Sequence, residues 1–196
     1  MEADWEIEIA PDAPVIDAAW EGYVDLRQGP VHIVEIREAD QLRTLADTLI
    51  RLNSPSSPVW TVKCDVWPVD GFDPDELDAD PKQAAQALGC YIDLIPVCAE
   101  IPSPLDAIVD WCRQLCLRLR SRPLRQSRVD TIVRRALITS DTVGLGITAY
   151  VTACGSSAQE AEEVLSSALD VLADSVLAIG STDQGSPKYN QDIVGE

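Results

Sequence analysis

The chain has 196 residues, of which 33 are Asp or Glu and 15 are Lys or Arg, so its formal charge is -18 at neutral pH. A hydrophobic content of 46% excludes a disordered chain, and this length buries a core without disulfide or metal support. The charge argues against general nucleic-acid binding, because phosphate contacts need a surplus of Lys and Arg, and it favours a basic or neutral protein partner.

The N-terminal residues and the cysteines predict a cytoplasmic protein. Met1 to Ile9 holds four carboxylates where a signal peptide has a basic start and an apolar stretch. No apolar run reaches the roughly 18 residues of a membrane span, so we expect no membrane segment. The six cysteines contain no CxxC pair, which predicts reduced thiols that pack as small apolar side chains.

The first predicted unit consists of two strands and a helix. Trp20 to Arg27 and Val31 to Arg37 are rich in β-branched and aromatic residues, which is typical of strands. Leucines at three- and four-residue spacing then predict a helix near Asp40 to Asn53.

The second unit begins with two further strands joined by an acidic segment. Val59 to Trp67 alternates in polarity, and such alternation favours an antiparallel sheet with one covered face. On the predicted apolar face of this strand lie Trp60, Val62, Cys64 and Val66. Pro68 to Pro81 predicts a long loop, with a helical turn from Asp73 to Leu77 as the alternative, before a strand at Gly89 to Ile95.

Two helices dominate the second half of the chain. An apolar stripe at helical spacing predicts the first, from the N-cap residue Ser103 to Pro123. Strands are predicted at Arg128 to Ile138 and Gly144 to Cys154. The second helix extends from Ser157 to Gly180 and begins with a predicted capping box.

These elements predict one α+β domain, residues 1–180, in which a six-stranded, mainly antiparallel sheet carries three helices on one face. The order is ββα three times, and the middle of the chain also gives βαββαβ, the order of a ferredoxin-like sandwich. The last residues, 181–196, are rich in small and polar residues and predict a flexible tail. Six strands leave two sheet edges, so we also expect self-association, such as a homodimer.

Few residues suggest catalysis or metal binding. His32 is the only histidine, and its phase with neighbouring apolar residues predicts a place on a strand, with pairing to a cysteine nucleophile as the alternative. Cys112 and Cys116 lie one helical turn apart, which allows a zinc site but fits buried packing better. We therefore expect no cofactor, no metal and no catalytic residues.

The acidic loop and two glycines also have more than one interpretation. Pro68 to Pro81 lacks the spacing of a calcium-binding EF-hand, so we expect a solvated loop, with cation binding or docking of a basic partner as alternatives. Gly144 and Gly146 do not form a nucleotide-binding motif, and they predict a bulge or the close approach of another backbone.

The basic residues are concentrated in one segment. Between residues 113 and 135 the chain holds eight arginines against one acid. The candidate anion- or partner-binding residues are Arg120, Arg122, Arg125, Arg128 and Arg135. Neutralisation by surrounding acids, within the chain or across an oligomer, is the other interpretation. Exposed ion pairs contribute only about 0 to 1 kcal/mol each to stability, so a stabilising role does not explain an exposed cluster, and recognition stays open. Among the tryptophans, Trp20 and Trp60 are expected in the core, and Trp111 is a candidate interface residue.

The sequence thus predicts a non-catalytic cytoplasmic protein that acts through protein–protein interaction, as an acidic binding protein, an adaptor or an immunity-type partner. The alternative is a small-molecule or anion-binding domain, including an enzyme, that uses the Arg-rich segment 113–135. A hollow lined by Trp60, Tyr91 or Tyr150 with one convergent arginine would favour this alternative. A contiguous acidic face would favour the first.

Overall fold

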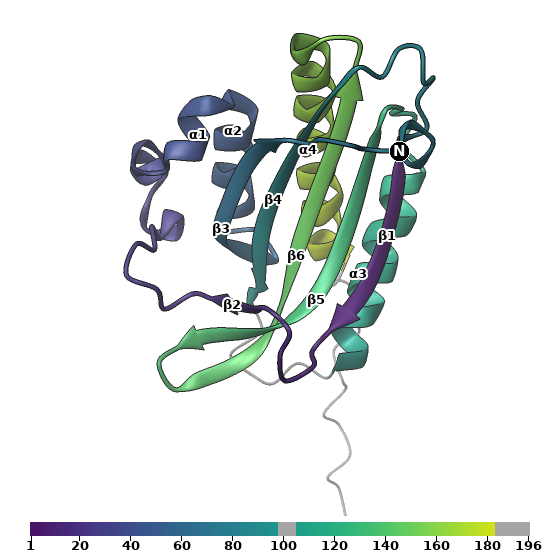
Figure 1. The fold of residues 1–196 in the computed structure, drawn as a ribbon. Coiled ribbons are helices and arrows are strands. Elements are labelled where there is room, and N and C mark those ends of the chain that lie inside the picture. The colour runs from purple at the N-terminus through teal and green to yellow at the C-terminus, as the bar shows by residue number, and fades with distance from the viewer. Residues whose placement is uncertain (98–104, 183–196) are drawn as a thin grey trace, which may run out of the picture.

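The computed structural model describes residues 1–97 and 105–182, and this part of the chain forms an α+β fold on one six-stranded mixed sheet. The strands are β1 (Glu2–Glu8), β2 (Val15–Asp17), β3 (Val59–Pro68), β4 (Gln86–Pro96), β5 (Ser127–Thr139) and β6 (Thr142–Gly155). Their order in space is β1-β5-β6-β4-β3, and β2 pairs with the far part of β5 (Figure 1). β1 and β2 run parallel to β5, so the expected mainly antiparallel sheet is wrong at this edge.

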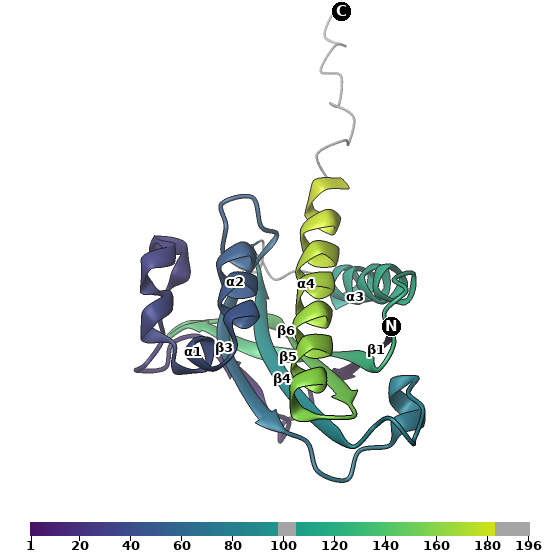
Figure 2. The same ribbon diagram turned by 90° about the horizontal axis from the view of Figure 1, so that it is seen from above.

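The three long helices lie on one face of the sheet. They are α2 (Arg43–Leu52), α3 (Leu105–Arg120) and α4 (Ala158–Thr182). The short helices are α1 (Arg37–Gln41), which contacts β3, and the 3-10 helices η1 (Leu26–Gln28), η2 (Pro30–Glu35) and η3 (Pro74–Leu77). Figure 2 shows α2, α4 and α3 side by side on the same side of the sheet. Among the described helices, none combines the length and apolar character that a membrane crossing requires.

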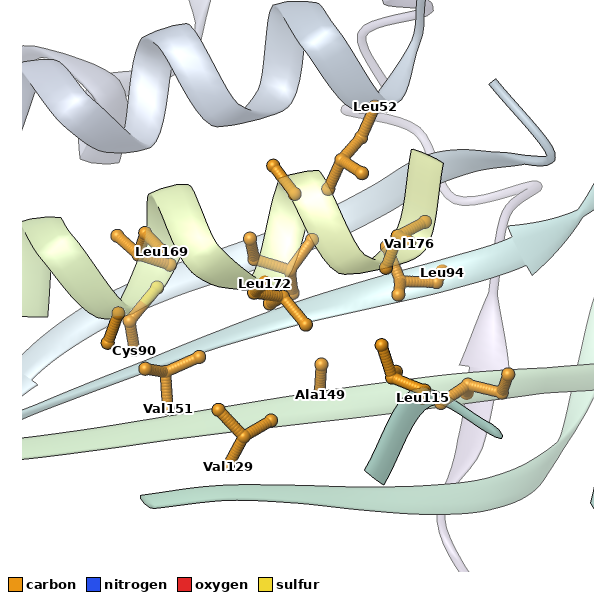
Figure 3. Close-up of a cluster of buried hydrophobic side chains, with 14 of the residues drawn as sticks. Leu52, Cys90, Leu94, Leu115, Val129, Ala149, Val151, Leu169, Leu172 and Val176 are labelled. Atoms are coloured by element: carbon orange, nitrogen blue, oxygen red, sulfur yellow. The ribbon is translucent and has the colours of Figure 1, made fainter. Parts of the chain in front are cut away.

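The core lies between these helices and the sheet. On α3 the buried positions are Ile108, Cys112, Leu115, Cys116 and Leu119, which is the predicted stripe. Figure 3 shows Leu169, Leu172 and Val176 of α4 against Cys90 and Leu94 of β4 and Ala149 and Val151 of β6. The packing of Cys112 and Cys116 in this core is confirmed, and burial raises the pKa of the Cys112 thiol to about 12.

The first two predicted strands are wrong. Residues 20–37 form turns, η1 and η2, because Gly29 has a φ of 154° and Pro30 lacks an N–H for a strand ladder. Their apolar residues Val24, Ile33 and Ile36 pack against the core without sheet pairing. The predicted βαββαβ order needs a strand at residues 31–37, and the predicted first ββα unit needs strands at residues 20–27 and 31–37. Neither order is therefore confirmed with the predicted strands.

Helix boundaries also differ from the prediction. The helix near Asp40 to Asn53 is divided into α1 and α2 by Leu42, whose φ of -137° and ψ of 103° are extended. At the start of α4, the Ser157 hydroxyl accepts the Glu160 N–H at 3.2 Å, but the Glu160 carboxylate reaches the Ser156 N–H instead of closing a capping box. α4 continues to Thr182; Ser103 and positions 183–196 of the predicted tail lie outside the described residues.

β3 contains a bulge that reverses its faces. Pairing with β4 shifts between Thr61 and Cys64. Trp60, before the shift, and Val62, within it, lie on the face away from the helices, whereas Cys64 and Val66 pack into the helix-side core. The prediction that all four share one face is therefore wrong, because one inserted residue changes the parity of everything after it.

Two segments cover the ends of the sheet face opposite the three long helices. Residues 15–24 are called the strap below. The strap is bound to β5 as far as Ala18, whose N–H donates to the Leu137 carbonyl, and it then continues to β3, where Tyr23 contacts Trp60. The strap encloses a small second core with Ile16, Ala18, Trp60, Val62, Ile95 and Ala136. At the other end, residues 69–85 cross the sheet and place η3 near β5 and β6, which confirms the alternative of a helical turn after Asp73 (Figure 1).

Candidate functional site

On the sheet face opposite the three long helices, the candidate site is the part that lies between the strap and residues 69–85, called the open face below. Because side chains alternate along a strand, the residues on this face are those whose neighbours pack into the helix-side core. They include Glu6 and Glu8 of β1, Arg128, Asp130, Ile132 and Arg134 of β5, Thr148, Tyr150 and Thr152 of β6, Tyr91 and Asp93 of β4, and Asp65 and Trp67 of β3.

Three aromatic rings occupy the middle of the open face. Tyr91 and Tyr150 are direct cross-strand neighbours with ring centroids 6.0 Å apart, and Trp67 lies 6.1 Å from Tyr91 and 6.5 Å from Tyr150. Trp67 lies across Gly89, where a Cβ atom would come within 2.7 Å of the indole. Burial raises the pKa of Tyr91 to about 12, so its hydroxyl is a neutral hydrogen-bonding group at physiological pH. These three rings, called the aromatic cluster below, are each half-buried.

Two connected hollows lie beside the aromatic cluster, over β5 and the β3–β4 connection. Hollow II, about 550 Å³, and hollow III, about 280 Å³, share Arg128, Asp130 and Thr152 and are together called the acidic groove. Its acidic lining residues are Asp4, Glu6, Asp70, Asp73, Glu76 and Asp130. The one basic lining residue is Arg128, whose Nε lies 2.8 Å from a carboxylate oxygen of Asp130. The groove therefore carries a net negative charge.

A chain of polar contacts links the groove to a buried carboxylate. Arg134 donates to Glu8 at 2.8 Å and, through Nη1, to Thr148 and Tyr150 at 3.2 Å each. Thr148 in turn donates to Asp93 at 2.6 Å. Asp93 is 7% exposed, and burial raises the pKa of its carboxyl group, against the lowering effects of the Thr148 hydrogen bond, Arg134 and Lys63.

Hollow I, about 400 Å³, lies on the other side of the aromatic cluster, at the β3 edge. Its apolar lining comes from Trp20, Val24, Ile36, Leu49, Val62 and Tyr91. Cys64 also lines it, and burial raises the pKa of that thiol to about 12, so it is a neutral thiol at physiological pH. Charged residues, among them Glu38, Lys63 and Asp65, complete the lining.

The predicted arginines do not converge on one site. Arg120 donates to the Ala3 carbonyl at 2.7 Å at the β1 edge, and Arg122 is exposed after α3. Arg125 forms a paired contact with Asp78, at 2.9 and 3.1 Å, and Arg135 donates to the carbonyls of Ala10 and Pro11. Arg128 is the one member of the predicted set that lines the groove. Most of the predicted arginines therefore form hydrogen bonds or ion pairs with neighbouring carboxylates or backbone carbonyls.

Other singled-out residues lie away from the groove. Trp111 is half-buried and packs against the helix-side core. His32 lies on η2, where its Nδ1 is 2.7 Å from Glu35, so its predicted strand position is wrong. Trp60 is buried as expected, but Trp20 is 39% exposed, which corrects its predicted place in the core. Within residues 1–97 and 105–182, no group of three His, Cys, Asp or Glu side chains could hold a metal ion.

Comparison with protein-family models, with curated proteins and with solved structures finds no match for this chain. The function must therefore be argued from the site itself. Sequence reasoning singled out Pro68 to Pro81, Tyr91 and Tyr150, but it missed β1. The signal was present, because Glu2–Glu8 alternates acidic residues with Ala3, Trp5 and Ile7, which is the pattern of a half-buried strand.

Replacing Asp93 with Asn is expected to stabilise the protein at neutral pH and to have progressively less effect as the pH falls below 4. The folded state raises the pKa of this carboxyl group, so it holds the proton more tightly than the unfolded chain and loses stability as the pH rises through the carboxyl range. Asn keeps an acceptor for Thr148 without the charge. Urea unfolding across a pH series measures the difference; the exposed variant Asp47→Asn is the control, and a constant difference at all pH values would refute the expectation.

Proposed function

We propose that this protein is a non-catalytic binding protein whose acidic groove takes a basic segment of a protein partner. The observation that carries the proposal is the groove lining, in which six carboxylates surround one arginine that is already paired with Asp130. Complementary charge speeds association and selects against partners of like charge. The half-exposed aromatic cluster beside the groove supplies contact area for a bound chain.

The groove contains Tyr150 and an arginine, which is the combination expected of an anion-binding pocket. Its charge supports a cationic occupant instead, because Asp130 neutralises Arg128 and no second arginine lines the groove in the described part of the chain. The proposal keeps the predicted cytoplasmic setting, in which the five free thiols of the described residues stay reduced.

Self-association remains a separate prediction. The edges of the sheet are β1 and β2 on one side and β3 on the other. β1 carries Glu2, Asp4, Glu6 and Glu8, and like charges of this kind oppose pairing of two β1 edges.

Neutralising three groove acids is expected to weaken binding of a basic peptide about tenfold, since exposed charge pairs contribute about 0.5 kcal/mol each and a tenfold change corresponds to about 1.4 kcal/mol. The variant is Glu6→Gln, Asp70→Asn and Glu76→Gln in one chain. Calorimetric titration with a short Lys/Arg-rich peptide measures the dissociation constant, and raising the salt concentration should reduce the difference.

The control variant carries the same change in net charge on the exposed helical surface: Asp47→Asn, Asp106→Asn and Glu162→Gln. It should bind the peptide nearly as the unaltered protein does. An acidic peptide of equal length should not bind. Equal weakening by both variants would show that the overall charge, and not the groove, attracts the peptide, and would refute the proposal.

A further inference from the structure

We propose that hollow I is a subsite for one large apolar side chain of the same partner, so that the protein recognises an apolar residue and a basic residue about four positions apart in an extended segment. This inference rests on the proposed function and names the motif that the acidic groove and hollow I would select together. It follows from the lining of hollow I, the exposure of Trp20 and the spacing of the strands.

The lining of hollow I differs in kind from that of the acidic groove. Side chains from the strap, α1, α2, β3 and β4 meet there, and the inner ones, such as Val24, Leu49 and Val62, are apolar. The Cys64 thiol is neutral, because burial raises its pKa to about 12. A hollow of about 400 Å³ has room for a leucine or an aromatic side chain, and removing such a side chain from water is favourable by about 1.5 to 3 kcal/mol.

Trp20 is a candidate anchor at the edge of hollow I. Its side chain is 39% exposed, and the Lys63 Nζ lies 5.0 Å from the ring centroid, within cation–π range. Gly22 allows this position, because a Cβ atom there would come within 2.1 Å of the indole ring. Tryptophan is one of the residue types that most often contribute a large share of the binding energy in protein interfaces.

The sheet sets the distance between the two subsites. Hollow I lies at β3 and the acidic groove over β5, with β4 and β6 between them. Three spacings between neighbouring strands amount to about 14 Å, which an extended chain spans in about four residues. Tyr91 lines hollow I and Tyr150 lines the groove, so a segment that joins the two subsites crosses the aromatic cluster.

The test uses the full chain and a set of peptides of one composition, each with a single leucine and a pair of adjacent Lys or Arg residues. The leucine stands next to the basic pair or four positions from it, and either before or after it in the sequence. A control peptide has serine in place of the leucine. Calorimetry measures each dissociation constant. We expect one four-position peptide to bind about tenfold more tightly than the serine peptide, which corresponds to about 1.4 kcal/mol.

Two variants test whether hollow I provides this gain. Trp20→Ala removes the anchor, and Gly22→Ala displaces the indole while keeping it in the chain. Both should abolish the advantage of the leucine peptide and leave the affinity for the serine peptide unchanged. Thermal unfolding of each variant checks that the fold is retained.

The outcomes separate this inference from the proposed function. If all peptides bind equally and depend on the groove acids, the apolar subsite is refuted and the proposed function stands. If no basic peptide binds, the proposed function is refuted, and this inference is refuted with it. If sedimentation shows a dimer that Trp20→Ala dissociates, a second copy of the chain occupies hollow I, and the inference is overturned.

Discussion

Replacing Leu115 with alanine is expected to lower the free energy of unfolding by about 3 to 5 kcal/mol. Leu115 is fully buried on α3 and belongs to the cluster that joins this helix to the sheet and to α4 (Figure 3). Truncation removes apolar area and leaves a cavity, because strands and helices on both sides hold the surrounding side chains in place. Urea denaturation followed by circular dichroism measures the change.

Leu117 provides a matched control on the same helix. Its side chain is 62% exposed and points away from the core, so Leu117→Ala should change the free energy of unfolding by no more than about 0.5 kcal/mol. Both substitutions have the same effect on helix propensity, which makes the difference between them a measure of burial alone. Similar losses for the two variants would show that α3 does not pack as described.

The amphipathic helices could be predicted because their signal is local. The stripe on α3 repeats every three or four residues, and the buried positions match it from Ile108 to Leu119. Strands β3 to β6 were found for the same reason, since each alternates or is rich in β-branched residues. Residues 20–37 have that composition too, but Gly29 and Pro30 interrupt the backbone, and tertiary contacts of Val24, Ile33 and Ile36 satisfy their apolar surface without a strand.

The groove could be predicted only in part, because it depends on long-range pairing. The acids of Pro68 to Pro81 are evident in the sequence, but nothing local brings them near Glu6, which reaches the groove through parallel pairing of β1 with β5. The bulge in β3 is a second example. It leaves Trp60 and Val62 on the face away from the helices while Cys64 and Val66 pack against them, whereas strict alternation along the strand predicts one face for all four.

The second large expected effect on stability is that of substituting Gly146 in β6, because this residue lies where the strap contacts the sheet. A Cβ atom there would lie 2.8 Å from Ile95 Cδ1, 2.9 Å from Ile16 Cδ1 and 3.1 Å from the Leu94 carbonyl oxygen. Gly146→Ala should therefore cost about 1 to 3 kcal/mol of stability through overpacking. Hydrogen exchange should show faster opening of the Ala18 amide, which bonds to Leu137. The sequence predicts the approach of another backbone at this glycine, but the two nearest atoms belong to side chains and the Leu94 carbonyl oxygen is the one backbone atom among the three nearest.

A second set of substitutions tests the cause of that cost. Ile16→Val and Ile95→Val each remove the Cδ1 atom that the new methyl group would meet, and alone each should cost about 0.5 to 1.5 kcal/mol. In the Gly146→Ala background the same pair should cost less or restore stability, because the space they leave is then filled. Equilibrium unfolding of the single, double and triple variants gives the coupling energy. Simple additivity would mean that the strap does not rest on Gly146, and hollow I, which the strap partly encloses, would then lack a fixed wall.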